Sequence, residues 1–436
     1  MRLGILGGGL SGVTLQSAFS GMSEILEKEV RIGGLCRTFH KDDFYYDIGG
    51  HILFSKDQGV LRYIKKVLAD NFAQGRRVNK ILLKGRYIKY PFENGLSSLE
   101  KEDIFKCLVG FLKADLSQKP KNFLEWIYCT FGRGIAENYL VPYNRKIWKV
   151  PLESVGMEWV GRVPRPSVEE IVKSALGIET EGYIHQLNFY YPAFGGIESL
   201  VKSILKPNKR AAITTGFEVK SIRRKKRQWC ISGGDDKRYF DKLVVTIPVK
   251  EAVRYLDRVP HRVRSAAESL RHYMVRVVMV GVRNSSLLDK SAIYLPQEDV
   301  LFHRVCYMGY FSRQNVPKGK SSLIAEMTTY KNHDLYKASN DVVIERTLRD
   351  LHRLGIIDKR EVCTTEIQNI EFGYIFYDLG YQKHIRILKA YFNSLGIELL
   401  GRFAEFEYIN MDEVILRSLR LAGKLNALKG KLDKKR

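Results

Sequence analysis

The chain has 436 residues, of which 45% are hydrophobic and 28% charged, as expected for a globular protein of two or three domains. No apolar run reaches the roughly 18 residues of a membrane-spanning helix, and no secretory signal precedes the first predicted strand, so we expect a cytoplasmic protein. The net charge of +24 favours anionic partners, and a phosphate-bearing substrate and an anionic membrane surface both fit it. No nucleic-acid-binding motif is visible, so nucleic acid is not expected as a partner.

The first segment predicts a dinucleotide-binding turn. Residues 3–6 have the pattern of a short buried strand, a glycine-rich turn follows at once, and residues 13–19 are compatible with a helix. Gly7 permits the tight turn, Gly9 lets the backbone approach a pyrophosphate, and Gly12 lets the helix pack closely on the strand. The phosphates would then face the positive end of the helix, where unpaired N–H groups favour an anion.

Three further features extend this site along the chain. A second predicted strand ends at Glu27, about twenty residues after the first glycine, where a carboxylate can accept hydrogen bonds from both ribose hydroxyls. A second glycine pair, Gly33-Gly34, lies beside Arg37, and backbone and guanidinium groups there could hold the far end of a longer cofactor. His51 follows Gly49-Gly50, so the backbone could approach a flat ring closely at that point.

The rest of the chain predicts a helical segment and then a series of strands. Residues 81–90 alternate like a strand, residues 96–137 become helical, and Ser167 with Glu170 forms the capping box of a helix over 167–176. Further helices are predicted at 197–205, 341–354, 382–395 and 410–419, and further strands at 217–222, 228–232, 243–248, 275–282, 292–295, 301–310, 322–328 and 367–374. The strand at 243–248 reads as fully buried, whereas those after 275 indicate an antiparallel sheet.

The six cysteines are scattered, with no CxxC pair and no neighbouring cluster of histidines. A disulfide framework and a zinc site are therefore not expected, and no metal is predicted. The sequence also contains no Ser-His-Asp or Cys-His arrangement of the kind that indicates a nucleophilic enzyme.

Taken in order, these blocks resemble the UDP-galactopyranose mutases, within the superfamily of flavin amine oxidases and protoporphyrinogen oxidase-like proteins. The resemblance spans nearly the whole chain and implies FAD as the cofactor. It implies an α/β fold in which a Rossmann-type FAD-binding domain, residues 1–90, 186–250 and 375–436, carries a mainly helical substrate lid, residues 91–185, and an antiparallel β-sheet substrate domain, residues 251–374. The cofactor-binding residues that it implies are Gly7, Gly9, Gly12, Glu27, Gly34, Arg37, Gly50, Val219, Arg402 and Asn410.

The resemblance also implies a substrate site made of distant parts of the chain. Arg162 and Arg304 match two arginines that grip a diphosphate from opposite walls, a task that suits the bidentate and permanently charged guanidinium. The block 401–412 is similar to one in which Arg402 contacts FAD, Tyr408 binds substrate phosphate, and a helix N-terminus points at the flavin. The implied catalytic residues are His51, Arg162, Arg304 and Tyr408, and the implied substrate-binding residues are Phe92, Asn144, Trp148, Arg162, Arg304, Tyr374 and Tyr408.

For the mutases, the resemblance implies a redox-neutral use of reduced FAD. The flavin N5 attacks the anomeric carbon and expels UDP, and the flavin–sugar adduct lets the ring open and reclose as furanose before UDP returns. We therefore predict an FAD-dependent enzyme that interconverts the pyranose and furanose forms of a nucleotide sugar. An external reductant such as NAD(P)H would supply the reduced flavin.

Two alternatives stay open at this stage. An oxidoreductase of the same fold, acting on an amine, a porphyrinogen or another small organic substrate, predicts an apolar pocket with the arginines pointing away. A non-catalytic protein that binds flavin or a membrane surface is supported by the basic charge and the basic tail. Glu93 and Phe311 also depart from the eukaryotic mutase pattern, which has glutamine and tyrosine there. The sugar, the nucleotide and the oligomeric state are therefore left open.

Overall fold

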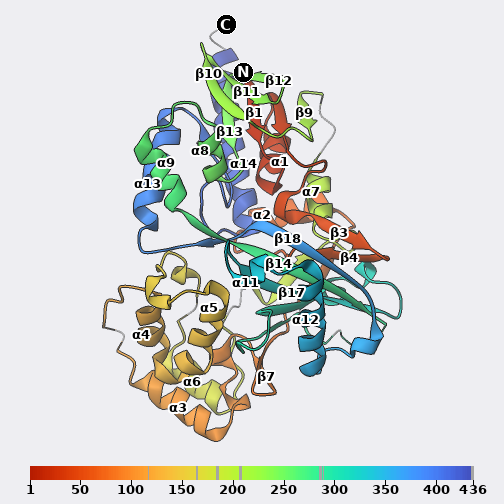
Figure 1. Cartoon of the computed structure of the whole chain (residues 1–436), viewed down its shortest axis with the longest axis vertical. Helices are drawn as coiled ribbons and strands as arrows, with labels where there is room; N and C mark the ends of the chain where they lie inside the picture. Colours follow the sequence, from red (N-terminus) through yellow and green to blue (C-terminus); the bar gives the residue numbers. More distant parts are fainter. Residues whose placement is uncertain are drawn as a thin grey trace.

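The fold is built around a five-stranded parallel sheet at one end of an elongated molecule (Figure 1). The computed structural model describes residues 1–433 except 116, 164, 183–185, 206–208, 284–286 and 288. The strand order is β19 (Glu398–Leu399), β13 (Lys242–Val245), β1 (Arg2–Leu6), β2 (Met22–Leu26) and β9 (Ala211–Thr214), with parallel pairing throughout. The predicted α/β class is confirmed. Since the carboxyl ends of parallel strands share one edge, Gly7 and Glu27, which follow β1 and β2, lie at the same edge.

Both faces of the parallel sheet are covered. Leu3 and Ile5 pack on one face and Leu6 on the other, as the alternation of side chains along a strand requires. The first face is covered by α1 (Leu10–Ala18), α7 (Glu198–Ile204) and α14 (Met411–Asp433), and the second by α8 (Val249–Tyr255), α9 (His261–Ser269), α13 (Tyr381–Ser394) and an antiparallel sheet of β10 (Ser221–Lys225), β11 (Gln228–Gly233) and β12 (Asp236–Phe240). The closing helix α14 is longer than the predicted 410–419.

A seven-stranded sheet forms the middle of the molecule (Figure 1). Its order is β18 (Val362–Phe376), β14 (Arg271–Val282), β17 (Ser321–Thr329), β16 (Arg304–Tyr307), β15 (Ala292–Tyr294), β6 (Asn79–Leu83) and β7 (Arg86–Lys89). The pairings are antiparallel except that of β15 with β6. The prediction of one strand over 81–90 is wrong, because Lys84 and Gly85 take φ angles of 50° and 77° and turn the chain into a hairpin. Residues 79–89 thus join this sheet, and the division of the chain into three domains stays a prediction.

The other end of the molecule is helical and contains α3 (Lys101–Leu112), α4 (Phe123–Ile135), α5 (Val141–Trp148) and α6 (Val168–Ala175) (Figure 1). The capping box of α6 is confirmed, because the Ser167 hydroxyl accepts the Glu170 N–H and the Glu170 carboxylate accepts the Ser167 N–H. Helices α3 and α4 cross closely at glycines: a Cβ on Gly134 would lie 2.2 Å from the Lys106 carbonyl oxygen.

Shorter elements connect these layers: β3 (Thr38–Lys41), β4 (Phe44–Asp47), α2 (Gln58–Leu68), β5 (Ala73–Arg76), β8 (Asn188–Tyr191), α10 (Met308–Phe311), α11 (Asp334–Lys337) and α12 (Asn340–Arg353). The hairpin β3–β4 ends just before Gly49-Gly50 and so delivers His51 to the middle of the molecule. Across the described ranges, no helix combines the length and the apolar character that crossing a membrane would take.

Candidate functional site

The glycine-rich turn between β1 and α1 has the geometry that the sequence predicts. Gly7 has a φ of 106°, which residues with side chains rarely adopt, and a Cβ on Gly12 would lie 2.2 Å from the Gly7 carbonyl oxygen. Gly9 is the N-cap of α1, and among the described residues no side chain caps this helix, so its first N–H groups are left for another acceptor. The turn therefore fits the phosphates of a dinucleotide.

Glu27, Gly34 and Arg37 lie around the same turn. Glu27 is 8% exposed, and its Oε2 accepts the Gly8 N–H at 2.6 Å. A Cβ on Gly34 would lie 3.0 Å from the Gly9 Cα, so the two glycine-rich segments touch through their backbones. Arg37 donates from Nε to the Gly34 carbonyl oxygen at 3.0 Å. An acid at the end of the second strand and a glycine-lined approach are the features that a nucleotide with ribose and pyrophosphate requires.

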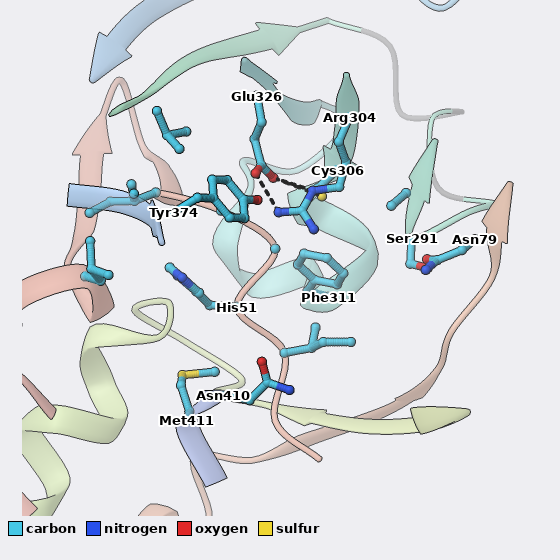
Figure 2. A pocket seen from close by; sticks show the side chains of 18 of the residues that line it. His51, Asn79, Ser291, Arg304, Cys306, Phe311, Glu326, Tyr374, Asn410 and Met411 are labelled. Carbon is cyan, nitrogen blue, oxygen red and sulfur yellow. Dashed lines mark hydrogen bonds and ion pairs between the residues drawn. The ribbon is translucent and has the colours of Figure 1, made fainter. Parts of the chain in front are cut away.

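A cavity of about 240 Å³ is lined in part by Leu35, the residue after Gly34. Figure 2 shows this cavity from close by. Residues from the segments 48–54, 304–326, 370–374 and 402–411 form most of its wall. It brings together seven of the predicted site residues: Gly50, His51, Arg304, Tyr374, Arg402, Tyr408 and Asn410. Cys36 Sγ lies 3.7 Å from Sδ of Met411, the first residue of α14 and part of the cavity wall. A long cofactor can therefore follow one path from Glu27 past Gly34 into the cavity.

Arg304 forms a bidentate ion pair with Glu326 in the cavity wall. Its Nε donates to Oε1 at 2.9 Å and its Nη2 to Oε2 at 2.5 Å, and the two residues are direct partners of β16 and β17. Glu326 is 2% exposed. Burial disfavours the charge on Arg304, but the Glu326 carboxylate acts together with Tyr374 and other neighbours to hold the pKa of Arg304 well above its ordinary value. Within the described part of the chain Nη1 of Arg304 has no partner, so it is the part of the guanidinium left for a ligand (Figure 2).

His51 lines the cavity with a buried ring nitrogen. Among the described residues its Nδ1 has no hydrogen-bond partner. Burial, and then the charges of Arg402 and Arg304, lower the pKa of His51 to about 3. The imidazole is therefore neutral at pH 7, and its unsatisfied nitrogen fits a polar group of a bound ring system.

Two tyrosines and an arginine form another part of the wall. The rings of Tyr374 and Tyr408 stack with centroids 5.9 Å apart and an interplanar angle of 7°. The Arg402 guanidinium lies 4.4 Å from the centroid of the Tyr408 ring. Arg402 also donates from Nε and Nη2 to the Ile409 carbonyl oxygen at 2.9 and 2.8 Å. It thereby fixes the loop that carries Tyr408 and Asn410.

A polar cluster that no sequence pattern predicted lies at the side of the cavity formed by β6 and β15 (Figure 2). With the Asn79 amide oriented to satisfy its neighbours, its oxygen accepts from Arg77 Nη2 at 2.7 Å and its nitrogen donates to Ser291 Oγ at 2.6 Å. Arg77 also donates to the Gln186 side chain. These residues meet because β6 pairs in parallel with β15, and no local motif predicts that pairing.

Apart from the predicted residues around the nucleotide turn, five predicted residues are not among those that line the cavity. Phe92 is fully buried among aromatic rings, and Asn144 donates to a backbone carbonyl one turn earlier at 2.8 Å. Trp148 packs in an aromatic cluster, and Val219 lies in the core under the parallel sheet. The side chain of Arg162 lies outside the described residues. Their roles in binding therefore stay predictions.

Together, the fold and the site combine a turn that fits the phosphates of a dinucleotide with a cavity whose wall contains three arginines. A family model described as flavin containing amine oxidoreductase matches residues 23–371, well over half of the chain. The chain belongs to this family of flavin containing amine oxidoreductases, and its membership implies a flavin cofactor. The glycine cradle, Glu27 and the unsatisfied His51 nitrogen fit such a group.

Three solved structures share this fold. Reduced UDP-galactopyranose mutase is 23% identical with a TM-score of 0.88, over 98% of this chain and 94% of that one. A putative protoporphyrinogen oxidase from Exiguobacterium sp. is 16% identical with a TM-score of 0.77, over 98% of both chains. Putrescine oxidase bound to putrescine is 14% identical with a TM-score of 0.65, over 98% of this chain and 99% of that one. The predicted mutase-like fold is confirmed, and this fold is compatible with both mutase and oxidase chemistry.

Proposed function

We propose that this protein is an FAD-dependent mutase that interconverts the pyranose and furanose forms of a nucleotide sugar while its flavin is reduced. The observation that carries the proposal is the charge of the cavity. The described residues that line it include three arginines, Arg77, Arg304 and Arg402, and one carboxylate, that of Glu326. A net positive cavity suits a diphosphate leaving group, whereas an apolar substrate gains nothing from it.

FAD is proposed because the described site is long. The acid at the end of β2, the phosphate-binding turn and the cavity follow one another along a single path, as adenosine, pyrophosphate and a ring system do in FAD. Reduced flavin, when bound, supplies a nucleophilic nitrogen for the anomeric carbon. Nη1 of Arg304 and the hydroxyls of Tyr374 and Tyr408 would hold the diphosphate. Neutral His51 would hydrogen-bond the cofactor without adding a charge.

A second candidate is an FAD-dependent oxidoreductase acting on a small organic substrate. Two observations favour it: Glu326 already neutralises much of the Arg304 charge, and Phe311 with Met411 gives the cavity an apolar side. The two candidates differ in what the flavin must do, since a mutase needs reduced flavin without net turnover of electrons and an oxidase passes electrons to oxygen.

The decisive experiment is chromatography of UDP-galactose after incubation with reduced and with oxidised protein. Isomerisation in the reduced sample alone supports the mutase. Oxygen consumption with an amine or a porphyrinogen, without any sugar isomer, would reject the mutase in favour of the oxidoreductase. Replacing dithionite with NAD(P)H under anaerobic conditions, while following flavin absorbance, tests the proposed external reductant.

A pair of tyrosine variants tests the assignment of the cavity. Tyr374→Phe removes a hydroxyl from the cavity wall and is expected to lower kcat/KM about 10-fold or more, the value of one hydrogen bond to a charged group. Tyr310→Phe is the matched control, because its hydroxyl donates to the Arg76 carbonyl oxygen and is not part of the cavity wall. Equal losses in both variants, at equal flavin content, would contradict the assignment.

A further inference from the structure

One end of the molecule carries cations that the proposed reaction does not use. The β10–β11 hairpin turns at Lys226 and Arg227, and the five consecutive residues 223–227 are all basic and all exposed. Lys225, Lys226 and Arg227 have no acidic partner within 4 Å among the described residues. Lys226 takes a φ of 52°, a conformation for which Gly or Asn is the usual choice. The conformation of the turn therefore does not explain why a lysine stands at this position.

The hairpin tip is continuous with the amino ends of the parallel strands. Gln228 donates to Asp241 at 3.0 Å, and Asp241 lies 3.9 Å from the Met1 amino group. Figure 1 shows the C-terminal end of α14 at this same end of the long axis. Asn426 of α14 accepts from the Ser20 hydroxyl at 2.9 Å, which joins the helix to the start of β2. We call this surface the basic end.

The basic end also carries further cations and exposed apolar side chains. Lys424 and Lys431 of α14 are exposed, and the sequence continues with Lys434-Lys435-Arg436. Met22, at the start of β2, is 57% exposed, and Leu428 of α14 is 43% exposed. The surface thus combines exposed cations, three of them on a projecting hairpin and without an acidic partner among the described residues, with scattered exposed apolar side chains.

We propose that the basic end docks the protein on an anionic phospholipid surface. Clusters of four to eight cations are attracted by the negative potential of such a surface, and exposed apolar side chains add contact with the acyl boundary. A nucleic acid would be held by the cations alone and would gain nothing from Met22 and Leu428. The glycine-rich turn and the cavity lie at the opposite edge of the parallel sheet, so docking leaves the catalytic cavity uncovered.

Vesicle co-sedimentation of the full chain tests this proposal. Binding is expected to vesicles of phosphatidylcholine with about 30% phosphatidylglycerol and not to phosphatidylcholine alone. It should weaken strongly between 0.1 M and 1 M salt, because the screening length falls from about 10 Å to about 3 Å. No binding to the anionic vesicles at 0.1 M salt, or tighter binding to a single-stranded RNA that displaces them, overturns the proposal.

A charge-matched pair of variants localises the effect. The variant K225Q/K226N/R227Q is expected to bind anionic vesicles roughly 100-fold less tightly, about fivefold for each lost cation. The control, K101Q/K113Q/K119Q, removes the same charge from exposed positions of the helical end and should stay within about threefold of the wild type. Equal losses in both variants would show that net charge alone acts and would overturn the assignment. Neither readout depends on turnover, so this proposal and the proposed function fail separately.

Discussion

Removing the Glu326 carboxylate is predicted to cost far more stability than removing both members of its ion pair. Glu326 is 2% exposed and binds Arg304 at 2.9 and 2.5 Å, so Glu326→Leu would leave a guanidinium that is only 23% exposed without its counter-charge. Breaking such a pair from one side costs about 3–5 kcal/mol, which is roughly 100-fold or more in the unfolding equilibrium. The double variant R304M/E326L replaces both charges with apolar side chains and should lie within about 1 kcal/mol of the wild type.

Urea unfolding of the wild type, the two single variants and the double variant measures this directly, with the free energies combined in a double-mutant cycle. Asp299→Ala is the matched control, because Asp299 pairs with Arg353 at 2.6 Å but both side chains are about half exposed, and less than about 1 kcal/mol should be lost. Two results would refute the coupling of this pair. One is a loss of unfolding free energy in the double variant equal to the sum of the losses in the single variants, and the other is a loss below about 1 kcal/mol for Glu326→Leu.

Three further predictions concern Glu93, Ser167 and Gly12. Burial raises the pKa of Glu93 from 4.5 to about 7. The stabilisation that the folded state gains by keeping Glu93 protonated is therefore fully present below about pH 4.5 and is lost as the pH rises to about 7. In urea unfolding, the wild type should lose about 3 kcal/mol of stability over that range relative to Glu93→Gln. Ser167→Ala removes the cap of α6 and should cost about 1 kcal/mol, whereas an unchanged midpoint would show that the capping box contributes nothing. Gly12→Ala places a Cβ 2.2 Å from the Gly7 carbonyl oxygen and should abolish flavin absorbance in the purified protein, so retained flavin would contradict the predicted turn.

The nucleotide turn could be predicted because its signals are local. The strand, the three glycines and Glu27 follow one another within a short stretch, and each has its own steric or hydrogen-bonding role. The capping box of α6 is local in the same sense. The hairpin at Lys84-Gly85 was missed although a Lys-Gly pair inside an alternating segment is a possible turn signal. The predicted end of the closing helix at 419 was too early, because α14 continues to Asp433 through Gly423 and Gly430, which lie at exposed positions.

The rest of the site depends on strand register, which a single sequence does not specify. Glu326 faces Arg304 because β16 and β17 pair in one register, and a shift of one residue would turn it to the other face of the sheet. Asn79 reaches Ser291 across a separation of more than two hundred residues. The family resemblance named five charged or aromatic residues of the cavity, His51, Arg304, Tyr374, Arg402 and Tyr408, but their contacts with one another required the structure.

The uninterrupted length of α14 connects two distant parts of the molecule. The helix runs without interruption from Met411, in the cavity wall, to Asp433, a length of about 34 Å at 1.5 Å per residue. A single helix therefore joins the wall of the candidate cavity to the basic end. Any tilt imposed at one of these places must either appear at the other or be absorbed by bending the helix between them.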